Sequence, residues 1–208
     1  MLKKFALSAA VAAVLLPASA MAANVITLSP IAVSPAANGV TTLLTFDVSG
    51  IASWGTLGDA SNVVALLNIG AGSTLDQVGW NVNLTATSPS WLSDIAVQFS
   101  DSVATQDTAI SLAPSATNAA GTASYVSSGL VDLTAANLSF AVGSDGKLRL
   151  EFYETWDDIV GAKDGMWNSG TLTLAVTAAT AVPEPGTYGL MALGMVGVLL
   201  AARRRRAA

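Results

Sequence analysis

The middle of the chain alternates apolar and polar side chains with a period of two, and this pattern limits the folds open to it. Leu44, Phe46 and Val48 form one such segment, with Thr45 and Asp47 between them. A β-strand with this pattern buries one face and leaves the other in solvent. Five further segments repeat it, with apolar positions at Val78, Trp80, Val82, Leu84 and Ala86, at Ile95, Val97 and Phe99, at Leu138, Phe140 and Val142, at Leu148, Leu150 and Phe152, and at Leu172, Leu174 and Val176.

Clusters of Gly, Ser, Asn and Pro separate these segments and mark the turns between strands. Residues 63–69 are apolar on both faces, which indicates a central strand or one covered by loops. Residues 114–129 are rich in small residues and are expected to form a surface loop. Since no segment shows the periodicity of an amphipathic helix, we predict an all-β domain over residues 23–181. Its roughly seven to nine strands would form an antiparallel β-sandwich of jelly-roll type.

The amino-acid composition excludes several kinds of functional site. The chain has neither cysteine nor histidine, so it cannot form disulfides, His- or Cys-ligated zinc sites, or Ser-His-Asp and Cys-His catalytic systems. Between residues 23 and 182, three basic residues stand against thirteen acidic ones, a net charge of −10. Affinity for nucleic acid comes largely from neutralising phosphates, so a domain this acidic is not expected to bind it.

Residues 1–22 have the three parts of a secretory signal peptide. Lys3 and Lys4 precede an apolar stretch of 12 residues, Pro17 ends it, and small residues with A-x-A spacing follow. The alternative is an N-terminal membrane anchor, but a spanning helix needs about 20 apolar residues. We predict cleavage after Ala22, with Ala20 as the second choice.

Residues 182–208 form a second targeting segment. Pro183, Glu184 and Pro185 are followed by 17 uncharged residues, 186–202, and these by Arg203, Arg204, Arg205 and Arg206. As a helix, residues 186–202 would be about 25 Å long, which spans a bilayer if the arginine stems reach the interface. We therefore predict a single transmembrane helix, with the arginine cluster held in the cytoplasm. The alternative is a buried C-terminal helix, which four adjacent like charges do not suit.

This order of parts resembles the PEP-CTERM sorting signal of exported proteins from Gram-negative bacteria that make extracellular polysaccharide. The segment is also described as an ice-binding-protein C-terminal domain, but Thr171, Thr173 and Thr177 are too few for the repeated threonine array of ice binding. The resemblance implies that an exosortase, a membrane transpeptidase-like enzyme, cuts near the Pro-Glu-Pro motif. The two prolines suit that role because they fix φ, remove backbone donors and keep the preceding residues extended.

The densest group of acidic residues follows the segment that ends at Phe152. Four carboxylates lie within 11 positions, with only Lys163 among them. Calcium takes several oxygen ligands, and one loop can supply them. The sequence thus offers a calcium site formed by Glu154, Asp157, Asp158 and Asp164, although the spacing is not that of an EF-hand. The alternative, which is commoner for charge runs, is a solvated acidic loop.

Five tryptophans suggest another kind of site, because an exposed indole can stack on a sugar ring. Trp80 lies in a core-facing row, and we expect the others to be buried or to cap the sandwich ends, since tryptophan is usually highly buried. A coplanar exposed pair beside a groove would instead indicate carbohydrate binding, and two facing buried carboxylates would indicate glycoside hydrolysis. The other four tryptophans are Trp54, Trp91, Trp156 and Trp167.

These observations predict an exported protein that is anchored transiently in the inner membrane, processed by an exosortase, and placed at the cell surface or in the extracellular matrix. No marked pair of catalytic carboxylates is present, so we do not expect an enzyme. The main expectation is a surface or matrix protein associated with extracellular polysaccharide, as in a biofilm. The alternatives are a carbohydrate-binding module and, third, a small glycoside hydrolase. No cofactor is expected apart from the calcium ion considered above.

Overall fold

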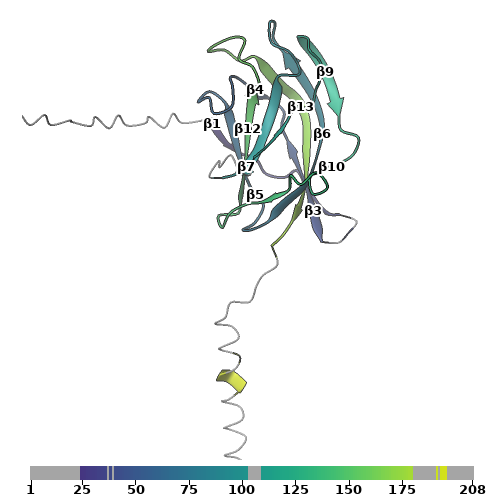
Figure 1. The fold of residues 1–208 in the computed structure, drawn as a ribbon, viewed down its shortest axis with the longest axis vertical. Helices are drawn as coiled ribbons and strands as arrows, with labels where there is room; N and C mark the ends of the chain where they lie inside the picture. The colour runs from purple at the N-terminus through teal and green to yellow at the C-terminus, as the bar shows by residue number, and fades with distance from the viewer. Residues whose placement is uncertain are drawn as a thin grey trace, which may run out of the picture.

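Two β-sheets packed face to face make up the domain (Figure 1). The computed structural model describes residues 24–36, 38, 40–102, 109–179, 191 and 193–195. Thirteen strands lie within these residues. The alternation in the sequence produces this arrangement, because each strand turns its apolar side chains toward the opposite sheet.

The first sheet has five strands in the order β1-β5-β12-β7-β8. They are β1 (Asn24–Thr27), β5 (Val63–Asn68), β7 (Ile95–Asp101), β8 (Ile110–Leu112) and β12 (Lys147–Glu154). The prediction of a purely antiparallel sandwich is wrong at one edge, where β1 runs parallel to β5. The chain between these two strands passes through the other sheet, and such a long crossover connection permits parallel pairing.

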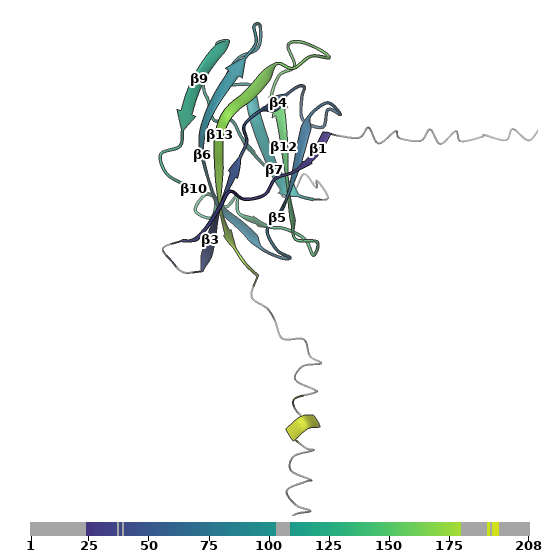
Figure 2. The ribbon, with the colours of Figure 1, turned by 180° about the vertical axis from the view of Figure 1, so that it is seen from behind.

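The second sheet has eight strands, and its central path is β10-β6-β13-β3-β2. β9 and β11 also pair with β6, and β4 pairs with β13. Its long strands β6 and β13, of 13 residues each, are paired antiparallel along the sheet (Figure 2). The eight strands are β2 (Ala32–Pro35), β3 (Thr41–Asp47), β4 (Ile51–Ser53), β6 (Thr74–Ala86), β9 (Gly121–Val126), β10 (Val131–Asp132), β11 (Phe140–Ala141) and β13 (Gly165–Thr177).

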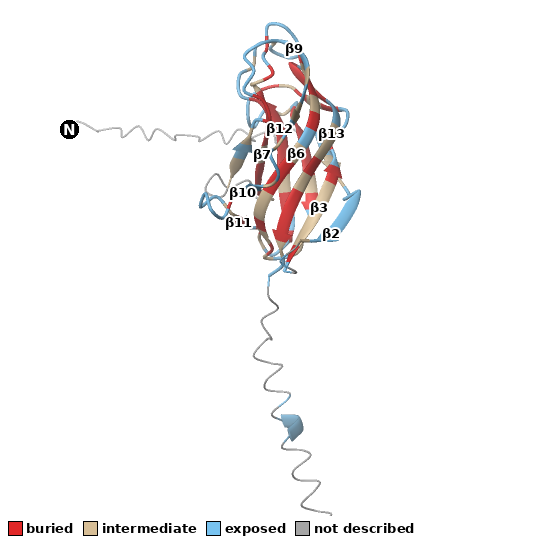
Figure 3. Ribbon diagram, turned by 90° about the vertical axis from the view of Figure 1, so that its right-hand side faces the viewer, coloured by how far each residue is buried: buried red, intermediate tan, exposed pale blue. Residues whose placement is uncertain are grey.

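The hydrophobic core lies between the two sheets, and buried residues concentrate in the facing strands (Figure 3). Phe152 of the first sheet and Trp167 of the second pack edge to face, with ring centroids 5.2 Å apart and planes at 86°. Burying an aliphatic or phenylalanine side chain contributes about 1.5–3 kcal/mol. The largest fully buried side chains are Trp167, Phe46, Phe99, Phe152, Leu67, Leu75, Leu84, Ile95, Leu148, Leu150, Leu172 and Leu174.

The strands predicted from alternation are present, since β3, β6, β7, β12 and β13 cover five of the six segments. The sixth is reduced to the two residues of β11, and Leu138 is half exposed. Residues 63–69 contain β5, which has β1 on one side and β12 on the other, as expected of an inner strand. Residues 143–146, one of the Gly- and Ser-containing clusters between strands, form a turn in which the amide of Gly146 donates to the carbonyl of Gly143 at 3.1 Å.

The prediction of a surface loop over residues 114–129 is wrong for its second half. Residues 121–126 form β9, which pairs antiparallel with β6. Two of its small polar side chains account for this, because the hydroxyl of Thr122 lies 2.6 Å from that of Thr85, and Ser124 accepts from Asn83 at 2.9 Å. Its other face carries Ala123 and Tyr125, which pack against the core. An alternation with only two such residues is too short and too weakly apolar to mark a strand in the sequence.

The predicted transmembrane helix over residues 186–202 lies almost entirely outside the described residues. Met191 and residues 193–195 are helical and exposed. Among the residues that are described, no helix reaches the length and hydrophobicity needed to cross a bilayer.

Candidate functional site

Two loops meet at the end of the sandwich where β13 begins. The Trp91 loop, residues 87–94, joins β6 to β7, and the Trp156 loop, residues 155–164, joins β12 to β13. They meet because Ala86 of β6 lies opposite Gly165 of β13, and the amide of Thr87 donates to the carbonyl of Asp164 at 2.8 Å. Gly165 permits this packing, since a Cβ there would lie 2.5 Å from Oε1 of Glu154.

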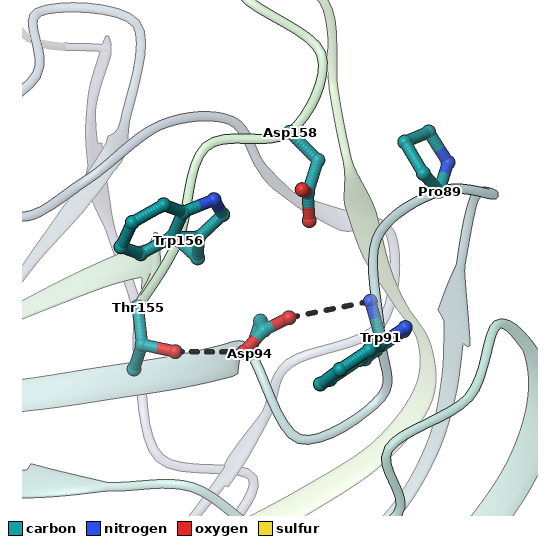
Figure 4. Close-up of a pocket in the computed structure, with 6 residues that line it drawn as sticks. All are labelled: Pro89, Trp91, Asp94, Thr155, Trp156 and Asp158. Carbon is teal, nitrogen blue, oxygen red and sulfur yellow. Dashed lines mark hydrogen bonds between the residues drawn. The ribbon is translucent and has the colours of Figure 1, made fainter.

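A pocket of about 590 Å³ opens between the two loops, and we call it the tryptophan pocket (Figure 4). Trp156 is 68% exposed and Trp91 is 46% exposed. Their rings lie on different sides of the pocket, and Figure 4 shows Trp156 by its face and Trp91 by its edge. The pair is therefore exposed, as a carbohydrate site requires, but it is not the coplanar pair named from the sequence. The volume is in the range of small-molecule sites. The lining residues are Pro89, Trp91, Asp94, Thr155, Trp156 and Asp158.

Asp94 connects the two walls of the tryptophan pocket. Its Oδ1 accepts from the hydroxyl of Thr155 at 3.0 Å, and its Oδ2 accepts from the amide of Trp91 at 3.3 Å. Its backbone carbonyl accepts from the amide of Thr155 at 2.8 Å. Both carboxylate oxygens of Asp94 are therefore engaged in holding the Trp91 loop against the residue that precedes Trp156.

Asp158, unlike Asp94, does not hold the two loops together through its carboxylate. Its side chain is exposed, and its carboxylate accepts no hydrogen bond from the described residues. Figure 4 shows this carboxylate pointing into the space between the two tryptophans. Its backbone amide donates to Oδ2 of the buried Asp164 at 2.8 Å, and the next amide, of Ile159, donates to the same oxygen at 3.2 Å. Asp164 thus holds the Trp156 loop in place and leaves the Asp158 carboxylate free for a ligand.

Glu154 is buried beside the pocket, at the end of β12. Its Oε2 accepts one long hydrogen bond, from Ser90 at 3.5 Å. Burial disfavours the charged form and raises the pKa of Glu154 to about 8, and the charges of Asp164 and Asp94 act in the same direction. Burial also raises the pKa of Asp164, although the amides of Asp158 and Ile159 oppose this.

A second buried glutamate, Glu151, has the cation and the hydrogen-bond donors that Glu154 lacks. Oε2 of Glu151 lies 2.6 Å from Nη2 of Arg149, in a partly buried ion pair. Its Oε1 accepts from the amide of Gly58 at 2.6 Å and from Nδ2 of Asn62 at 2.8 Å. No comparable cation lies at Glu154 among the described residues, so a proton is the simplest way to neutralise that carboxyl group.

The residues predicted to bind calcium are only partly brought together. Oxygens of Glu154, Asp157 and Asp164 are buried without hydrogen-bond partners, and the charge of Asp157 acts on Asp164. Even so, no three acidic side chains of the described residues are grouped so that they could hold a metal ion. Asp158 faces the pocket instead. Calcium binding at these four residues stays a prediction.

The tryptophans divide into two groups. Trp167 is fully buried and Trp80 packs against the core, as predicted, and Trp54 is half-buried. The expectation that Trp91 and Trp156 cap the sandwich is wrong, because both are exposed at the pocket. No sequence pattern indicated that Asp94 joins them, since the Asp94–Thr155 hydrogen bond connects residues 61 positions apart.

The targeting segments predicted from the sequence fall outside the described residues. These are the signal peptide over residues 1–22, the motif at Pro183, Glu184 and Pro185, and the arginines at 203–206. Comparison with known families nevertheless identifies the C-terminal segment, since residues 181–206 match the PEP-CTERM protein-sorting motif. This segment is a PEP-CTERM sorting signal. No curated protein and no solved structure matches the chain.

The PEP-CTERM signal marks the chain as an exosortase substrate. The protein is therefore exported, anchored in the membrane and then sorted. Its order of parts agrees with that role, because the Pro-Glu-Pro motif lies between the β domain and the apolar segment. The signal covers only the C-terminus, so what the β domain does has to be argued from its own residues.

Proposed function

We propose that the processed protein is a non-catalytic surface or matrix protein whose jelly-roll-like β domain binds extracellular polysaccharide in the tryptophan pocket. The observation that carries this proposal is the exposure of Trp91 and Trp156 on two sides of one pocket. Tryptophan is usually highly buried, so two exposed rings at one place indicate an interaction site rather than a requirement of the fold.

The chemistry of the pocket suits a sugar chain. A pyranose ring has an apolar face of C–H groups and a rim of hydroxyls. Two indoles can cover the faces of neighbouring rings, and their differing orientation fits a chain that twists between residues. The free carboxylate of Asp158 accepts hydrogen bonds from hydroxyls, and bonds to an ionised acceptor are the stronger ones.

The position of the pocket also suits a displayed binding domain. The tryptophan pocket lies where β13 begins, and the chain continues toward the sorting signal after β13 ends at Thr177. With 13 residues, β13 places about 40 Å between these two ends of the domain. The pocket thus opens at the end of the domain opposite to the end that precedes the membrane anchor.

The carboxylates favour binding over hydrolysis. A glycosidase needs two carboxyl groups on either side of the scissile bond. Glu154 and Asp164 are buried and do not line the pocket, and both oxygens of Asp94 are occupied. This leaves Asp158 as the one free carboxylate on the lining, which supports a binding module and not an enzyme.

The experiment measures retention of the processed protein on the extracellular polysaccharide of the producing bacterium, for the wild type, Trp91→Ala and Trp156→Ala. We expect each substitution to weaken binding about tenfold or more, because tryptophan is enriched among the interface residues whose truncation costs about 2 kcal/mol or more. Val160→Ala is the matched control, because Val160 is 87% exposed on the same loop as Trp156 and does not line the pocket. Equal retention of all four proteins would refute the proposal.

A further inference from the structure

The charges around the tryptophan pocket restrict which glycan can enter it. Its lining has two carboxylates, Asp94 and Asp158, and no lysine or arginine. Of the three basic residues between 23 and 182, Arg149 is already paired with buried Glu151. A uronic-acid polymer would have to place its own carboxylates next to these two, and no lysine or arginine lines the pocket to pair with them. Such like-charge contacts are unfavourable and suppress binding.

The same arrangement attracts a positive group. The carboxylate of Asp158 points into the space between Trp91 and Trp156 and has no hydrogen-bond partner among the described residues (Figure 4). An ammonium group there can pair with Asp158 and donate charge-assisted hydrogen bonds to it. It can also lie over an indole face, which attracts cations through the quadrupole of the ring.

We infer that the ligand of the tryptophan pocket is a glycan with free amino groups, an amino-sugar polymer that is cationic near neutral pH. This inference rests on the proposed glycan-binding function and adds the chemical class of the ligand. A pyranose ring with one amino group satisfies both kinds of lining: the ring covers an indole, and the ammonium group meets Asp158. The acidic excess of the domain attracts a cationic polymer over longer range. It is a formal net charge of −10 between residues 23 and 182, to which the buried Glu154 contributes little near neutral pH.

The test compares three oligosaccharides of equal length: glucosamine oligomers, their N-acetylated forms and galacturonate oligomers. Calorimetry with the processed protein is expected to show glucosamine oligomers binding at least tenfold more tightly than the acetylated form, with galacturonate the weakest. Asp158→Asn should reduce the preference for the free amine toward unity. Asp132→Asn should keep the preference, because Asp132 is exposed and lies opposite Gln77, near the other end of β6.

Two outcomes would overturn the inference. The first is equal affinity for the glucosamine and N-acetylglucosamine oligomers, which would leave the proposed function in place with a neutral ligand. The second is undiminished binding of glucosamine oligomers by Trp156→Ala, which would mean that the polycation binds the acidic surface and not the pocket. Absence of binding to all three sugars, together with no retention on the bacterial polysaccharide, would contradict the proposed function itself.

Discussion

Asp94 and Thr155 are joined by two hydrogen bonds, one from the hydroxyl of Thr155 to the Asp94 carboxylate at 3.0 Å and one from its amide to the Asp94 carbonyl at 2.8 Å. Thr155 directly precedes Trp156, and Asp94 also accepts from the amide of Trp91. This pair therefore fixes both tryptophans relative to each other, although neither residue needs to touch a ligand. It acts as a positioning element of the pocket.

Replacing Thr155 with valine should loosen the pocket. The substitution keeps the shape and removes the hydroxyl, so we expect a loss of about 1 kcal/mol in unfolding free energy, measured by urea denaturation. Polysaccharide binding should weaken as well, and acrylamide should quench tryptophan fluorescence more strongly. Thr155→Ser is the control, because it keeps the hydroxyl. Equal binding and quenching in the two variants would show that this hydrogen bond does not position Trp156.

The strands could be predicted from the sequence because alternation is a local property. In the segments around Phe46, Phe99 and Phe152 every second residue is apolar and packs in or against the core. The sequence pattern did not predict β9, because Thr122 and Ser124 are polar and form hydrogen bonds with polar side chains of β6. Its position depends on a partner strand distant in the sequence, and no pattern within residues 114–129 encodes that.

The pocket could not be predicted for a related reason. Whether a tryptophan at a strand end is buried depends on which loops lie beside it, and that depends on the pairing of β6 with β13. The burial of Glu154 likewise comes from Gly165 and Ile95, which pack around it. The sequence did indicate that residues 151–164 are the chemically unusual stretch. It did not separate the buried Glu154 and Asp164 from the exposed Asp158.

Glu154 should make the stability of the domain depend on pH. Its pKa of about 8 in the folded protein lies above the ordinary glutamate value of 4.5, so the folded state binds more protons than the unfolded state between these values. The contribution of Glu154 is complete below about pH 4.5 and is lost as the pH rises through 8, with a slope of up to about 1.4 kcal/mol per pH unit.

Glu154→Gln tests this directly, since glutamine has a similar shape and does not ionise. Urea denaturation of wild type and variant from pH 5 to 9 should show a wild-type unfolding free energy that falls more steeply with pH than that of the variant. The two curves should therefore lie close together near pH 5 and separate toward pH 9, where the wild type is the less stable protein. If they stay parallel across this range, the carboxyl group of Glu154 does not titrate as its burial requires.

Replacing Pro183, Glu184 and Pro185 with alanine should block sorting. The three substitutions remove the rigid, extended segment at the exosortase site, so the protein should accumulate in the membrane fraction with its C-terminus intact. Mass spectrometry of the exported wild type should show loss of the arginine cluster and of about 22 N-terminal residues. Thr180→Ala, in the linker before the motif, should be processed normally. A mature wild-type mass that still includes Arg203–Arg206 would contradict processing at this signal.

Calcium should stabilise the domain if the Trp156 loop can bring its carboxylates to one ion. Oxygens of Glu154, Asp157 and Asp164 are buried without partners, and a cation would satisfy them. Asp158 would have to move from the pocket to join them. Binding to the folded state alone adds about 2.7 kcal/mol at a hundredfold excess over Kd, which is roughly 5–10 °C in the melting temperature of a domain of this size.

Thermal melts of the processed protein in millimolar calcium and in chelator, at equal ionic strength, measure this shift. It should be larger at pH 9 than at pH 6, because the ion competes with the proton on Glu154, whose pKa is about 8. The double substitution of Asp157 and Asp158 by asparagine should abolish the shift, and Asp132→Asn should retain it. Equal midpoints with calcium and chelator at both pH values would show that no calcium ion binds at this site. Glu154 and Asp164 would then be neutralised by protons alone.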